Sequence, residues 1–162
     1  PESASPFYGS WCWPLVKDLD VDLLQQAGAL LLGNHSFKAF AKSGQEHRGD
    51  RSIVSEAAWV GLGTIGLAFH ITANRFLHHM VRYLVGTMVD VSLGRRPLAE
   101  MEALLSDPGT THVTSAPAPS QGLFLTEVHY PDPLPTDLSP TRGSSPSPES
   151  PVDGFENGPP EG

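Results

Sequence analysis

One arginine within an apolar, helix-forming stretch is the residue of this sequence best suited to chemistry. Arg82 lies one helical turn after His78 and one turn before Gly86, whose missing side chain leaves space beside it. A guanidinium among apolar residues is costly to desolvate unless a carboxylate or a phosphate meets it. The sequence therefore predicts an anionic partner for Arg82. His78 and His79 are candidates for phosphate contact or acid–base chemistry, although core and capping histidines are commoner.

The element that carries Arg82 is predicted to be the end of a strand followed by a long amphipathic helix, over Ile71 to Gly94. The chain is expected to turn at Asn74 and then to form about five helical turns. Two adjacent apolar rows follow the helical spacing, and they consist of Phe76, Met80, Leu84, Leu77, Val81, Val85 and Met88. These rows predict that one side of the helix packs on a core.

Three segments of the chain, in the expected order, resemble the TruA family of tRNA pseudouridine synthases. They are GNHSFKAF at 33–40, NRFLHHMVRYLVGTMVDVSLGRRP at 74–97 and APAPSQGLFLTEVHYP at 116–131. The resemblance extends over residues 5–131. It implies an isomerase that converts uridine to pseudouridine in the tRNA anticodon stem-loop, without a cofactor or a metal. By this resemblance, Arg82 is the active-site arginine that pairs with a catalytic aspartate.

The resemblance also implies roles for residues around Arg82. Leu123 matches an apolar residue of the substrate pocket and Phe37 would border the same cleft, although both also suit ordinary core packing. Eight of the ten Lys and Arg residues lie between 38 and 96, on a chain of net charge −8, and such a local basic surface is compatible with RNA contact. The candidates for contact with the tRNA backbone are Asn74, Arg75, Arg95 and Arg96.

The catalytic aspartate of the family is expected to lie outside this chain. The family carries it in an Arg-Thr-Asp-x-Gly-Val-His motif of an N-terminal half, and no segment here matches that motif. The active-site tyrosine of the family would fall upstream of Pro1, and Tyr8 is not at its position. The chain is therefore expected to be the C-terminal half of such an enzyme, inactive alone. Its expected partners are tRNA and the N-terminal half, and the complete enzyme would be a homodimer.

Residue patterns predict an α+β fold of the ferredoxin-like type that lacks its first strand. Asp18 or Asp20 would cap the first helix, and Phe37 and Phe40 would pin a short helical turn onto the core. We expect a three-stranded sheet with helices on one face and an uncovered edge prone to self-association. The expected elements, in chain order, are a helix ending at Leu32, strands over 52–62 and 64–72, the Arg82 helix, a helix starting at Pro97 and a strand over 122–130.

The expected organisation is an irregular segment over 1–17, the pseudouridine synthase domain over 18–131 and a disordered tail over 132–162. The tail holds half of the prolines and carries a net charge of −5, with little aliphatic content to offset its ordering entropy. A lone cysteine, Cys12, excludes an internal disulfide framework and a Cys-based zinc site. His35 and His47 lack partners at metal-ligand spacing.

Neither a signal peptide nor a membrane-spanning stretch is expected from the sequence, and the cytoplasm is the default location. Two further function classes remain open at this stage. One is an RNA-binding module that has lost catalysis. The other is an interaction domain that uses the bare edge of the sheet, with the acidic tail as a spacer.

Overall fold

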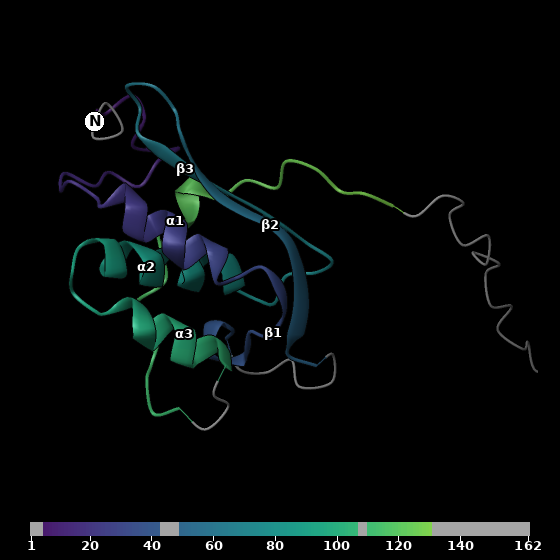
Figure 1. Cartoon of the computed structure of the whole chain (residues 1–162). Helices are drawn as coiled ribbons and strands as arrows, with labels where there is room; N and C mark the ends of the chain where they lie inside the picture. The colour runs from purple at the N-terminus through teal and green to yellow at the C-terminus, as the bar shows by residue number, and fades with distance from the viewer. Residues whose placement is uncertain (1–4, 43–48, 107–109, 131–162) are drawn as a thin grey trace, which may run out of the picture. The chain divides into compact units, whose positions relative to one another are not determined.

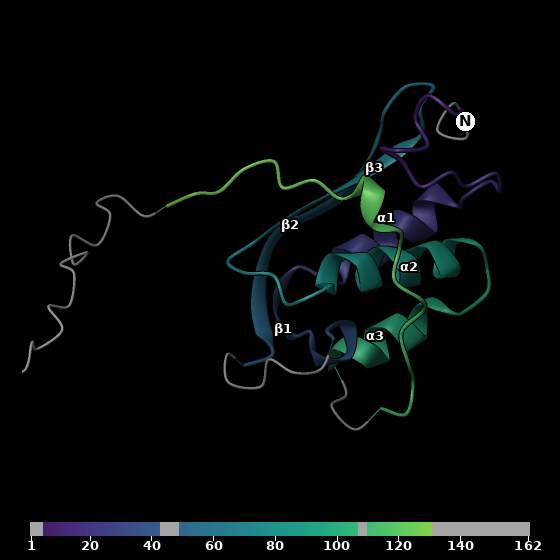
Figure 2. The same cartoon turned by 180° about the vertical axis from the view of Figure 1, so that it is seen from behind.

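The computed structural model describes residues 5–42, 49–106 and 110–130, and the described elements confirm an α+β fold. All three α-helices lie on one side of the sheet (Figures 1 and 2). The helices are α1 (Val21–Ala29), α2 (Met80–Ser92) and α3 (Leu98–Ser106), with short 3-10 turns η2 (Lys38–Phe40) and η4 (Ser120–Gly122). The strands are β1 (Gly33–Ser36), β2 (Arg51–Gly61) and β3 (Leu67–Ala73).

The sheet is antiparallel, with strand order β1-β2-β3. Strands β2 and β3 form the expected hairpin, with a register shift between Val54 and Glu56. The connection is closed by a hydrogen bond from the Leu62 N–H to the Gly66 carbonyl (2.8 Å). Gly66 has φ +142°, a backbone conformation that side chains disfavour, so a glycine suits this turn. Apolar residues of β3 pack against the core on one face, as their alternation predicted.

The third strand is not the expected one. Residues 123–130 form no strand, and the third strand is β1, which pairs with the beginning of β2. Alternation alone cannot make a strand, because its backbone groups need a partner ladder. Strand β1 is short and polar, so its composition gave no strand signal; Arg51 stabilises it by donating to the Asn34 side chain (3.1 Å) and carbonyl (2.8 Å).

Helix α1 is capped by Asp20, whose carboxylate accepts a hydrogen bond from the Leu23 N–H (3.0 Å). The helix ends at Ala29 rather than at Leu32, because the chain tightens into three-residue turns there. The Leu31 N–H donates to the Gly28 carbonyl (3.1 Å), and the Leu32 N–H to the Ala29 carbonyl (3.3 Å). Gly33, with φ +99°, then leads into β1.

Helix α2 begins at Met80, later than expected, and is therefore shorter than five turns. The preceding residues are held by other partners. The Asn74 N–H extends the sheet by donating to the Ile53 carbonyl (3.0 Å), and the Arg75 carbonyl accepts from the Ser52 hydroxyl (2.6 Å). His79 adopts φ +66°, a left-handed conformation that an α-helix cannot include. The helix therefore starts only after His79.

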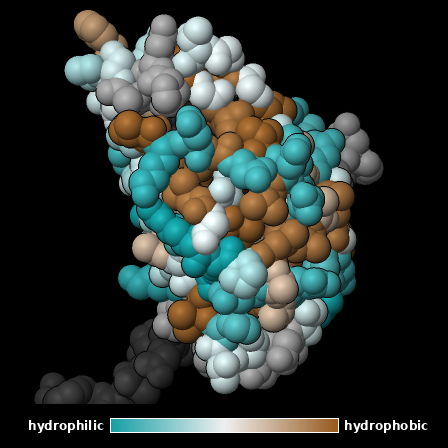
Figure 3. All heavy atoms as spheres, turned by 60° about the vertical axis from the view of Figure 1, so that its left-hand side comes forward, coloured by the Kyte–Doolittle hydropathy of each residue, from teal (hydrophilic) through white to brown (hydrophobic). Residues whose placement is uncertain are grey.

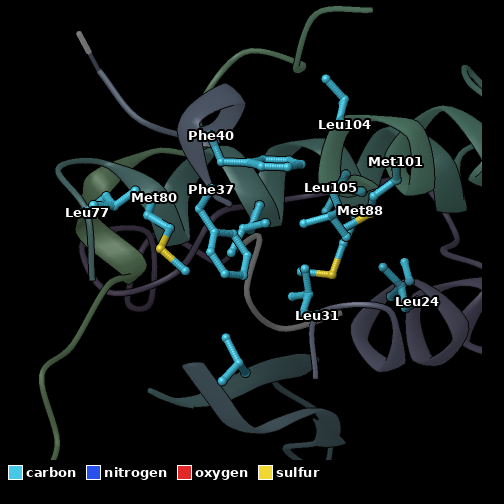
Figure 4. Close-up of a cluster of buried hydrophobic side chains, with 14 of the residues drawn as sticks. Leu24, Leu31, Phe37, Phe40, Leu77, Met80, Met88, Met101, Leu104 and Leu105 are labelled. Carbon is cyan, nitrogen blue, oxygen red and sulfur yellow. The ribbon is translucent and has the colours of Figure 1, made fainter. Parts of the chain in front are cut away.

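The core lies between the sheet and the helices, and Figure 4 shows side chains from α1, η2, α2 and α3 meeting there. Phe37 and Phe40 are fully buried, with their rings 6.4 Å apart edge to face. The expectation that these two phenylalanines pin a short helical turn onto the core is confirmed. The apolar row of α2 is buried at Met80, Leu84 and Met88, whereas Phe76, which precedes the helix, is largely exposed.

Apolar side chains also reach the surface. Figure 3 brings the left-hand side of Figure 1 forward and shows an apolar area there, crossed and bordered by hydrophilic residues. In the described ranges, no helix is long and apolar enough to cross a membrane. The same ranges bring together no group of three or more potential metal ligands. The predicted tail over 132–162 and His47 lie outside the described residues.

Candidate active site around Arg82

Arg82 lies in the first turn of α2 and is anchored by backbone groups rather than by an acid. Its Nε donates a hydrogen bond to the Ala118 carbonyl oxygen (2.7 Å), and its own carbonyl accepts one from the Ala118 N–H (2.9 Å). Among residues 5–42, 49–106 and 110–130, no carboxylate forms an ion pair with Arg82. The same residues supply no hydrogen-bond acceptor to Nη1 or Nη2. This end of the guanidinium is therefore available to an anion.

The segment that holds Arg82 runs from Val113 to Ala118, and we call it the strap. It follows α3 in the chain and passes along α2, as the green trace in Figure 2 shows. The Ser115 N–H donates to Thr87 Oγ1 (3.3 Å), one turn and a half after Arg82. Gly86 admits the strap at closest approach, because a Cβ there would clash with the Ala116 carbonyl oxygen and lie 3.3 Å from the Ala118 nitrogen. The space that Gly86 was expected to leave is thus filled by backbone.

His78 and His79 lie just before α2, with ring centroids 4.0 Å apart. The Lys42 N–H donates to the His78 carbonyl (3.1 Å), which brings Lys42 to the same end of α2 as Arg82. Burial, followed by the charges of His78, Arg82 and Lys42, lowers the pKa of His79. A lowered pKa favours the neutral form of His79. Phosphate contact or proton transfer by the two histidines stays a prediction.

Asn74 and Arg75, predicted to contact tRNA, directly follow β3 in the chain and form hydrogen bonds with the start of β2. Asn74 Oδ1 accepts from the Ile53 N–H (2.8 Å) and from the Ser52 hydroxyl (3.2 Å). Arg75 donates to the Gly49 carbonyl (3.0 Å). Both residues therefore have structural contacts, and their contact with tRNA stays a prediction.

Arg95 and Arg96 begin the connection between α2 and α3, and both pair with acids. Arg95 lies 2.7 Å from Asp90, with 53% of its side chain exposed. Arg96 is 12% exposed and donates to Glu100 (2.8 Å), to the Ser115 hydroxyl (3.1 Å) and to the Val113 carbonyl (2.7 Å). Arg96 thus clamps the start of the strap, whereas Arg95 faces solvent.

The ion pair between Asp90 and Arg95 should make a contribution to stability that depends on pH. Burial raises the pKa of Asp90, but hydrogen bonds from Arg95 and Ser115 and the charges of Arg95 and Arg96 outweigh it, so the net pKa is lowered. A lowered carboxylate pKa stabilises the fold above the unfolded value of about 3.9, and the effect is lost as pH falls through the folded pKa. We expect Asp90→Asn to lower the unfolding free energy by about 0.5 kcal/mol at neutral pH, since the pair is partly exposed.

Urea unfolding between pH 2 and pH 7 measures this difference. The difference in unfolding free energy between the native chain and Asp90→Asn should disappear in acid. At neutral pH the same difference should be smaller when both chains also carry Arg95→Met. A difference of equal size at all pH values would contradict the ion-pair interpretation.

The two predicted pocket residues lie in different settings. Phe37 is fully buried in the core, beside His35 at a ring distance of 6.1 Å. Leu123 is 49% exposed and follows η4, where its N–H donates to the Ser120 carbonyl (3.0 Å). The structure brings neither into contact with Arg82 by any hydrogen bond or ring contact among the described residues. Their role in a substrate pocket stays a prediction.

Sequence reasoning singled out Arg82 and Gly86 as candidates but missed the groups that contact them. Ala118, Ser115 and Thr87 carry no composition signal for a site, because the strap makes each of these contacts through backbone atoms. The arrangement fixes the guanidinium through Nε and leaves Nη1 and Nη2, in one plane, without an acceptor among the described residues. This end of the guanidinium suits bidentate binding of a carboxylate or a phosphate.

Comparison with known proteins gives a consistent match. The family model described as tRNA pseudouridine synthase matches residues 27–131, which include the whole of α2 and the strap. A protein named tRNA pseudouridine synthase A from Chlorobium luteolum is 37% identical over 81% of this chain and 51% of its own length. Proteins of the same name from Myxococcus xanthus and Thermus thermophilus are 35% and 33% identical, over 79% and 72% of this chain and 48% and 46% of their own lengths. The chain thus spans about half the length of the curated relatives it matches.

Proposed function

This chain belongs to the tRNA pseudouridine synthase family, and we propose that it is the Arg82-bearing part of an enzyme that isomerises uridine to pseudouridine in the tRNA anticodon stem-loop. The observation that carries this proposal is Arg82 itself. It lies in the matched segment, is anchored through Nε to Ala118, and presents a donor end that no described acid occupies. The proposed partners are tRNA and the part of the enzyme that this chain does not match, within a homodimer.

In the proposed reaction, the C1′–N1 glycosidic bond of the target uridine breaks, the base turns, and C5 bonds to C1′. The hydrogen on C5 leaves as a proton and N1 regains one, so the reaction is balanced without a cofactor. A base inside a stem or stacked loop must first be flipped out, at a cost of roughly a few kcal/mol. An aspartate acts on the flipped nucleotide as nucleophile or base.

We place this aspartate outside the 162 residues, because none of them matches the family's aspartate motif. Arg82 would bind the carboxylate through Nη1 and Nη2, which fixes its orientation. The opposite charge would also favour the ionised carboxylate when the pocket closes around the substrate. This chain alone would then be inactive.

The order of elements supports a ferredoxin-like domain whose first strand also lies outside these residues. Such a unit runs strand, helix, strand, strand, helix, strand. Here α1, β2, β3 and α2 follow that order, with β1 and α3 added.

Tritium release from tRNA labelled at uridine C5 tests the proposal. The chain alone should release none. The reconstituted enzyme, meaning this chain mixed with or fused to the part of the Chlorobium luteolum relative that it does not match, should release tritium with time. Release by the chain alone would contradict the proposed division of the active site. If every reconstituted form bound tRNA but released no tritium, the chain would instead fit an RNA-binding module that has lost catalysis.

A further inference from the structure

Arg82 is held at a single residue of the strap. Its Nε and its carbonyl both bond to Ala118, the last residue of the strap. Ala118 has no side chain that could fix it in place beyond its methyl group. Besides the burial of Ala118 itself, the attachment of the strap at other points along its length contributes to fixing it.

Among the described residues, Arg96 and Thr87 bind the strap before it reaches Ala118, and Asp90 accepts a further hydrogen bond from the Ser115 side chain. Arg96 binds the Val113 carbonyl and the Ser115 hydroxyl, and its third nitrogen, Nε, donates to Glu100 (3.1 Å). Thr87 Oγ1 accepts from the Ser115 N–H and donates to the Tyr83 carbonyl (2.8 Å), so the strap is tied to α2 itself. All three donor groups of the Arg96 side chain are used within the chain.

We propose that Arg96 is a positioning residue for Arg82, acting through the strap that it and Thr87 hold against α2. Glu100 binds Arg96, and Arg96 in turn binds the strap at Val113 and Ser115. Further along the same strap, Ala118 binds Arg82. An arginine suits this place because its rigid planar fork directs three separate nitrogens at these acceptors, whereas lysine has a single nitrogen. The role rests on the proposed function of Arg82, although the positioning itself does not require turnover.

This role differs from contact with the tRNA backbone, which the sequence suggested for Arg95 and Arg96 alike. Arg96 is 12% exposed and committed to internal acceptors, whereas the adjacent Arg95 is 53% exposed. Arg95 is therefore the matched control: it is the same residue type, one position away, and among the described residues it pairs with Asp90 and makes no direct hydrogen bond or ion pair with the strap.

The test is hydrogen exchange of the Arg82 Nε–H, measured by nitrogen-edited NMR on the 162-residue chain. The signal is identified by its absence in Arg82→Lys. In the native chain the hydrogen bond to Ala118 should protect this proton. We expect Arg96→Ala to raise its exchange rate by about tenfold or more, the effect of losing one hydrogen bond of a charged donor, and Arg95→Ala to leave it unchanged.

Near-ultraviolet circular dichroism of each variant shows whether it is folded. If Arg96→Ala does not fold, Thr87→Val serves instead: it keeps the side-chain shape, removes the acceptor of the Ser115 N–H, and should raise the exchange rate in the same direction. Unchanged exchange in a folded Arg96→Ala, or in Thr87→Val where that variant replaces it, would overturn the proposal. Because the readout needs no turnover, a failure here is distinct from a failure of the tritium-release test.

Discussion

Replacing Arg82 by alanine should reduce tritium release by the reconstituted enzyme roughly a thousandfold, the effect of leaving a buried carboxylate without its partner. The affinity for tRNA should change by less than about tenfold, because most of it comes from contacts with many phosphates. Single-turnover assays at saturating enzyme, together with filter binding of tRNA, separate the two effects.

Arg82→Lys and Arg95→Ala are the matched controls for this prediction. Lysine keeps the charge but cannot donate through Nε to Ala118 while presenting two further donors, so Arg82→Lys should remain severely impaired. Arg95→Ala removes one positive charge from an exposed position and should retain most of the turnover. Near-native turnover by Arg82→Ala would refute the assignment of this residue to the active site.

The parts of the fold that the sequence predicted are those determined by local patterns. The β2–β3 hairpin follows from its alternation, and the cap at Asp20 from its position before an apolar periodic run. The start of α2 could not be predicted, because it depends on a left-handed backbone at His79 and on bonds from Ser52 and Asn74. The expected strand over 122–130 was wrong for a related reason: a strand exists only where another strand pairs with it.

In the candidate site, too, some residues could be recognised from the sequence and others could not. Arg82 is recognisable because a charged residue among apolar helix positions needs an explanation, and Gly86 because a glycine inside a helix costs stability unless space is required. The strap is not recognisable, since Ala118 and Ser115 contribute backbone groups whose position depends on the whole tertiary structure. Arg96 looked like its neighbour Arg95 in the sequence, and only burial and contacts separate the two.

Replacing Gly86 by alanine should lower the unfolding free energy of the chain by about 1–3 kcal/mol, the usual cost of overpacking. In most helices the same change would stabilise by roughly 0.5–1 kcal/mol, because alanine is the better helix former. Here the added Cβ would clash with the Ala116 carbonyl oxygen, a backbone atom that cannot rotate aside. The strap must therefore shift, and the bond from Arg82 Nε to Ala118 should be lost with it.

Gly28→Ala provides the control, since Gly28 is also buried in a helix. Its added Cβ would lie 3.5 Å from the Ala57 carbonyl oxygen and 3.7 Å from the Phe69 and Trp59 rings, which are ordinary contacts. Gly28→Ala should therefore leave stability unchanged or raise it slightly, as measured by urea unfolding of both variants. If Gly86→Ala proved as stable as Gly28→Ala, the strap would be free to move. A mobile strap could not hold the guanidinium of Arg82, so the site would have to be organised by the part of the enzyme that supplies the aspartate.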